Sequence, residues 1–247
     1  MLKSLSVNLN NKYRPQEYRD SWIDNACPIL AIFIVIAIIT PSILGLMFKL
    51  NNFPMSNFTK ICISLLSTQI LFIISPLIIA LIVSKKTKLR EKLLFVNWSS
   101  DYFKIAFIYE IILFLPLMLL TIIIYAIASH LGYTYISPLA KLLSGSGKYG
   151  IALVFIFSVL IAPIIEEIVF RRVIFSFVER MFGILPAMIA TSLIFAFLHG
   201  GIIQIIPLFI LGSILQYLYI RYNSLFPSIL LHSFHNLIIM SLFVLYK

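Results

Sequence analysis

Long runs of apolar residues constrain the fold of this chain more than any other feature. A helix needs about 20 apolar residues to cross about 30 Å of hydrocarbon, and runs close to that length recur along the sequence. Hydrophobic residues make up 61% of the 247 positions and charged residues only 11%. Since a soluble domain carries charge at roughly a quarter of its positions, the sequence predicts an integral membrane protein.

The apolar runs predict an all-α fold, a polytopic transmembrane helical bundle with seven or eight spans. A short apolar segment at 169–182 also carries four charged residues, so it is either a short helix at the interface or an eighth, tilted span. A polar tail at 1–27 would precede a single membrane domain at 28–247. The seven clearer spans are residues 29–48, 61–83, 103–128, 151–165, 184–199, 202–220 and 226–246.

The basic residues predict orientation rather than nucleic-acid binding. The net charge is +10, but the lysines and arginines gather in the N-terminal tail and in the loops that would lie on the same side of the membrane as this tail. Basic loops on the cytoplasmic side are the usual bias of membrane proteins. We therefore expect a multi-pass protein of the cell membrane with a cytoplasmic N-terminus and no nucleic-acid partner. Cys27 and Cys62 lie at or inside apolar segments, which does not predict a disulfide framework.

A few ionisable side chains lie in or at the end of these apolar runs. Burying one in hydrocarbon costs roughly 2.5–3.5 kcal/mol on insertion scales, so each needs a reason. They are Glu110, Glu166, Glu167, His199, His232 and His235. All but Glu110 fall in the last third of the chain, and this concentration predicts a polar functional site there.

The spacing of the first cluster separates two roles for its acids. Glu167 and Arg171 are four residues apart and share a helix face, so they can form an ion pair. Glu166 points about 100° away and is free to face a cavity, where a carboxylate can act as a general base. The alternative is an ordinary charged helix end among lipid headgroups.

Two further elements supply imidazoles and an amide. His199 ends the 184–199 run, and His232 and Asn236 lie one turn apart on the final span. Alone, each is explained by helix capping or by hydrogen bonding between helices. Together with Glu166 they form a hydrolytic set, in which the carboxylate and one imidazole activate water. The other imidazole and the amide would stabilise an oxyanion.

These three motifs, Glu166-Glu167-x-x-x-Arg171, Phe195-x-x-x-His199 and His232-x-x-x-Asn236, resemble the ordered motifs of the CPBP family. This is the CAAX-protease and bacteriocin-processing (Abi) group of intramembrane proteases, and the resemblance covers about 150–245. It implies that Glu166 is the base and His199 its partner, while His232 and Asn236 form the oxyanion site. Glu167, Arg171 and Phe195 would support them, and His235 lies outside the pattern.

The resemblance implies an intramembrane endopeptidase, bacterial by family and composition, that hydrolyses a peptide bond of a membrane-associated substrate. We expect no required cofactor, because H-E-x-x-H is absent and Asn236 is a poor zinc ligand. Zinc remains the alternative, held by His199, His232 and Glu166. Two other functions also stay open, a non-catalytic regulator or bacteriocin self-immunity protein and an ion-coupled transporter using Glu110. The sequence predicts neither the substrate nor the oligomeric state.

Overall fold

The computed structural model describes residues 59, 98–135, 143, 147–199 and 201–245. Every regular element in these residues is helical, which confirms the all-α prediction there. Two segments, η2 and η3, are π-helical, and η4 is a 3₁₀ turn. In chain order the elements are α5 (Asp101–His130), α7 (Gly147–Ile156), η2 (Phe157–Ile161), α8 (Ala162–Glu167), η3 (Ile168–Ile174), α9 (Phe175–Phe182), α10 (Ile184–His199), η4 (Ile202–Gln204), α11 (Ile205–Tyr222) and α12 (Phe226–Leu245).

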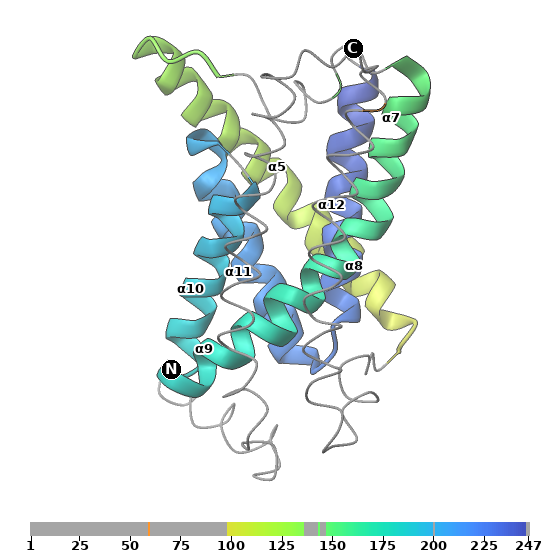
Figure 1. Ribbon diagram of the computed structural model, residues 1–247, viewed down its shortest axis with the longest axis vertical. Helices are drawn as coiled ribbons and strands as arrows, with labels where there is room; N and C mark the ends of the chain where they lie inside the picture. Colours follow the sequence, from red (N-terminus) through yellow and green to blue (C-terminus); the bar gives the residue numbers. More distant parts are fainter. Residues whose placement is uncertain (1–58, 60–97, 136–142, 144–146, 200, 246–247) are drawn as a thin grey trace.

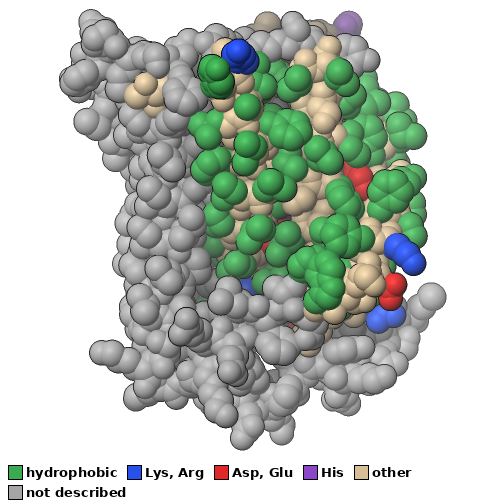
Figure 2. Space-filling view, turned by 90° about the vertical axis from the view of Figure 1, so that its right-hand side faces the viewer, with side chains coloured by type: hydrophobic (Ala, Val, Ile, Leu, Met, Phe, Trp, Pro, Cys, Tyr) green, Lys and Arg blue, Asp and Glu red, His purple; other side chains and the backbone are tan. Residues whose placement is uncertain are grey.

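Four helices in the described part are long and apolar enough to cross a membrane: Asp101–His130, Gly147–Glu179, Ile202–Tyr222 and Phe226–Leu245. The apolar helix α10 has 16 residues, and at 1.5 Å per residue it extends only about 24 Å. Figure 2 shows apolar side chains covering most of the described surface on one face, with basic side chains toward its ends. The tail at 1–27 and the expected spans 29–48 and 61–83 lie outside the described residues, so the total of seven or eight stays a prediction.

The segment 169–182 is not a separate helix, as both interpretations from the sequence assumed, but the continuation of the helix before it. Its position at the interface or within the membrane stays a prediction. The chain stays helical from Gly147 to Phe182 and ends at Gly183, whose φ of +86° stops the helix. Figure 1 shows this stretch changing direction as it passes from α7 through α8 to α9. The charges at 171 and 172 do not end the helix, because Arg171 is paired with Glu167 one turn earlier and Arg172 donates to the Tyr219 hydroxyl.

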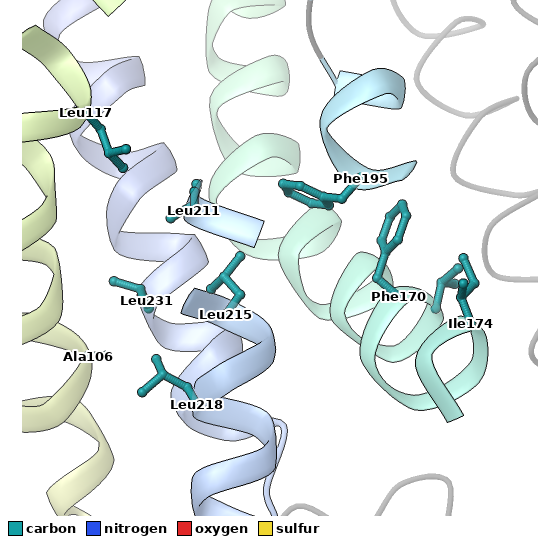
Figure 3. Close-up of a cluster of buried hydrophobic side chains, with 10 residues drawn as sticks. Ala106, Leu117, Phe170, Ile174, Phe195, Leu211, Leu215, Leu218 and Leu231 are labelled. Atoms are coloured by element: carbon teal, nitrogen blue, oxygen red, sulfur yellow. The ribbon is translucent and has the colours of Figure 1, made fainter. Parts of the chain in front are cut away.

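The largest core cluster joins η3, α10, α11, α12 and α5 (Figure 3). Its aromatic part is an edge-to-face pair, with the ring centroids of Phe170 and Phe195 5.2 Å apart. Helices α10 and α11 approach closely at Gly212, where an added Cβ would lie 3.2 Å from Phe195 and 3.4 Å from the Cα of Ser192. Small residues at such a crossing let two helices pack tightly in a membrane. This packing holds the C-terminal half of α10 against η3.

Candidate active site

Glu166 on α8 and His199 at the end of α10 form the centre of the site. The His199 Nε2 lies 2.9 Å from the Glu166 Oε2, and the His199 Nδ1 lies 2.8 Å from the carbonyl oxygen of Phe195. A carbonyl only accepts, so Nδ1 is the protonated ring nitrogen. The short contact between Nε2 and Oε2 then needs one further proton, carried by either atom. The two side chains therefore form an acid–base pair that shares a proton.

Glu167 organises a second, deeper layer. Its Oε2 accepts from the Arg171 Nε at 2.8 Å, and its Oε1 lies 3.1 Å from the His232 Nδ1. The Glu167–Arg171 ion pair expected from the spacing is therefore present, and both side chains are fully buried. Arg171 stays protonated, so Glu167 is an ionised acceptor and the His232 Nδ1 donates to it. The other ring nitrogen of His232, Nε2, lies 3.7 Å from the Glu166 Oε2.

Phe195 is the apolar wall between these groups. Its ring stacks on the imidazole of His199 with centroids 4.1 Å apart and an interplanar angle of 28°. Its edge meets the ring of His232 at 5.6 Å, and the guanidinium carbon of Arg171 lies 5.1 Å from its centroid. One fully buried side chain thus fixes the ring planes of both histidines. Its supporting role in catalysis stays a prediction.

Exposure differs sharply between the two layers. The side chains of Glu166 and His199 are 12% and 25% exposed, whereas those of Glu167 and Arg171 are fully buried and that of His232 is 3% exposed. A reactant from outside therefore reaches the Glu166–His199 pair first. The pair is the accessible edge of an otherwise dry polar cluster, in which electrostatic interactions are stronger than in water.

Asn236 lies one turn beyond His232 on α12, but it bonds to the backbone rather than to the two histidines. Its Nδ2 donates to the carbonyl oxygen of Ser158 in η2 at 2.8 Å. Ser158 was not among the residues predicted from the sequence. A backbone carbonyl carries no side-chain signature, and the only available signal was the proline five residues later, Pro163, just before the glutamate pair.

His235 and Glu110 form a second polar contact between α12 and α5. The Nδ1 of His235 lies 3.1 Å from the Glu110 Oε1, and both side chains are largely buried. The other carboxylate oxygen of Glu110 is buried without a hydrogen-bond partner among the described residues. The sequence offered an interhelical bond as one role for Glu110, and the structure contains that bond. Neither residue has a hydrogen bond to Glu166 or His199 among the described residues.

The three residues predicted as alternative zinc ligands, His199, His232 and Glu166, are not arranged around an open metal position. Their nitrogen and oxygen atoms bond to one another, and across the described ranges no group of three or more His, Cys, Asp or Glu side chains is arranged to hold a metal ion. Zinc takes three protein ligands in most catalytic sites, and the donor atoms here are already paired through protons.

One family model matches the part of the chain that holds this site. Residues 148–238 match the family described as Rce1-like, type II CAAX prenyl endopeptidase. This segment is similar to the Rce1-like family, which is consistent with the CPBP/CAAX protease group. The match covers α7 through most of α12, including all seven residues of the three motifs. No curated protein and no solved structure matches the chain significantly.

The Rce1-like family is a protease family, so the match supports a peptidase activity for this membrane protein. The predicted resemblance is thereby confirmed for the C-terminal part of the chain. Helix α5, which carries Glu110, lies before the matched residues.

Proposed function

We propose that the protein is an intramembrane endopeptidase that cleaves a membrane-associated substrate with water activated by Glu166 and His199. The observation that carries this proposal is the 2.9 Å contact between these two side chains, which are 33 residues apart in sequence. A carboxylate and an imidazole at this distance, partly open to the outside and backed by a dry ionic layer, form a suitable general acid–base unit.

The proton transfers follow from the hydrogen-bond pattern. His199 Nδ1 is held as a donor by the carbonyl of Phe195, so proton exchange runs through Nε2 and the carboxylate of Glu166. Glu166 accepts a proton from water as the water oxygen attacks the scissile carbonyl carbon. The same pair then returns a proton to the amine nitrogen as the C–N bond breaks. The net reaction consumes one water and releases a carboxylic acid and an amine.

His232 is the proposed oxyanion donor. Its Nδ1 is occupied by Glu167, so Nε2 is the ring atom that remains for the reactant, on the side of Glu166. In the imidazolium form Nε2 is an N–H donor, and the ionised Glu167 behind the ring balances the added charge. Asn236 is the proposed second donor through the amide hydrogen that does not point at Ser158. Such preorganised donors act strongly where water is excluded.

The proposed substrate is a peptide or protein anchored in or on the bilayer, since the site lies between helices that cross the membrane by length and composition. The family description names a CAAX prenyl endopeptidase, so a C-terminal segment of a lipid-anchored protein is the first substrate class to test. The proposed setting is the cell membrane, with the N-terminus and the mouth of the site on the cytoplasmic side.

The test compares membrane proteomes and purified enzyme for the wild type and Glu166→Gln, with Lys148→Gln as a control that also removes one charge, at an exposed position. Glu166→Gln should let one or more membrane precursors accumulate and should abolish cleavage in the purified protein, while Lys148→Gln does neither. Full cleavage by Glu166→Gln would refute the assignment of the base.

A further inference from the structure

We infer that Asn236 is a positioning residue, which fixes the direction of Glu166 by capping a carbonyl left open in the helix before it. The inference rests on the proposed function of Glu166. It gives Asn236 a structural role in addition to its proposed role as an oxyanion donor. It is carried by the hydrogen bonding around η2, the π-helical segment Phe157–Ile161 that joins α7 to α8.

The backbone bonds at η2 leave the carbonyl of Ser158 without its usual partners. In an α-helix the N–H of Ala162 would donate to Ser158, four residues earlier. Here the N–H of Ala162 donates instead to the carbonyl of Phe157, five residues earlier. In the same wide register the donor to Ser158 would be residue 163, but that residue is proline and has no N–H.

Asn236 supplies the missing donor from another helix. Its Nδ2 lies 2.8 Å from the Ser158 oxygen, a bond that spans 78 residues of sequence. A backbone carbonyl in an apolar interior needs a partner, and inside a membrane no bulk water provides one. The wide turn, the proline and the amide are three separate observations that meet at one oxygen atom.

The width of this turn decides which acid faces His199. Relative to an α-helix, a π turn holds one extra residue, and one residue corresponds to about 100° of rotation. If η2 narrowed to an α turn, α8 would rotate by about that angle relative to α7. Glu166 and Glu167 would then no longer face His199 and His232 respectively. The bond from Asn236 holds the wide turn and, through it, the side-chain directions of both acids.

The proposal predicts a rescue. Asn236→Ala should lower kcat by about tenfold to a hundredfold, as expected for an unpaired buried carbonyl and a displaced base, with a smaller effect on KM. Pro163→Ala restores an N–H in register with the Ser158 oxygen, so in that background the loss of kcat on Asn236→Ala should shrink by at least about threefold, and the loss that remains is that of the oxyanion donor. Pro207→Ala, a buried proline in α11 far along the chain, is the matched control and should give no rescue.

An equal loss of kcat on Asn236→Ala in the Pro163→Ala and wild-type backgrounds would overturn the inference, because an amide needed only for the oxyanion cannot be replaced by a backbone N–H at 163. The melting temperature of the substrate-free protein is a second measurement, which does not depend on peptidase activity. Asn236→Ala should lower the melting temperature, and Pro163→Ala should reverse most of that shift. An unchanged melting temperature in Asn236→Ala would also overturn it. A Glu166→Gln variant that keeps its activity would refute the proposed function. The melting temperatures would still test the bond from Asn236 to the Ser158 carbonyl.

Discussion

Replacing Arg171 by methionine removes one half of a fully buried ion pair and tests the deeper layer of the site directly. Both side chains of the pair are 0% exposed, and the Arg171 Nε lies 2.8 Å from the Glu167 Oε2. Removing one partner of a buried pair leaves an uncompensated charge and costs about 3–5 kcal/mol. We therefore expect Arg171→Met to lower the free energy of unfolding by that amount and to lose peptidase activity.

The double variant Glu167→Gln/Arg171→Met separates stability from activity. Without the stranded carboxylate, most of the lost stability should return, to within roughly 1–3 kcal/mol of the wild type, which is the cost of a buried amide with unmade bonds. Activity should stay about 10²-fold low, the scale of losing one oxyanion donor, because His232 no longer has a charged acceptor at Nδ1. The measurements are denaturant unfolding in micelles and cleavage kinetics.

Arg221→Met is the control for this series, because Arg221 is an exposed arginine at the end of α11. Its unfolding free energy should change by no more than about 0.5 kcal/mol. An Arg171→Met protein as stable and as active as this control would refute the reasoning about the buried pair. A double variant that recovers both properties would show that His232 does not depend on Glu167.

Three other outcomes follow from the site. His199→Gln should lower kcat by about 10²–10⁴-fold with unchanged melting, and an unaffected kcat would remove His199 from the acid–base pair. Gly212→Leu should lower activity by displacing Phe195, whose Cδ1 would lie 3.2 Å from a new Cβ. The control is Ser213→Leu, on the neighbouring face of α11. Gly132→Leu is unsuitable as a control, because the φ of +83° at Gly132 strains any side chain. Exhaustive chelation of the purified protein should leave cleavage intact, and activity that is lost and then restored by stoichiometric zinc would establish a metalloprotease.

The helix positions were largely predictable, because the length of each apolar run and the glycines that flank it both mark where a helix begins and ends. The run 184–199 was predicted with the bounds that α10 has, since Gly183 precedes it and glycines follow. The ion pair of Glu167 with Arg171 was also predictable, because a four-residue spacing on a helix fixes the geometry. The continuity of the helix through 169–182 was not, because the four charges in that window suggested an interface.

The spacing of residues along the sequence did not predict which side chains of different helices contact one another. That Glu166 rather than Glu167 meets His199 depends on the rotation of α8, and that rotation depends on a π turn that no hydrophobic period reports. The motifs named side chains that lie close together in the structure, but they did not indicate that Asn236 bonds to a backbone oxygen. Pro163 was the one local sign of that irregularity.

The bond between Glu110 and His235 bears on how this protein can be divided. Glu110 belongs to a helix upstream of the Rce1-like segment, yet its carboxylate is the partner of an imidazole next to Asn236. A fragment cut to the matched residues would leave the His235 Nδ1 without this partner and strip α12 of its contacts with α5. The family boundary drawn along the sequence is therefore not a boundary of folding, and truncated versions built on it should insert poorly.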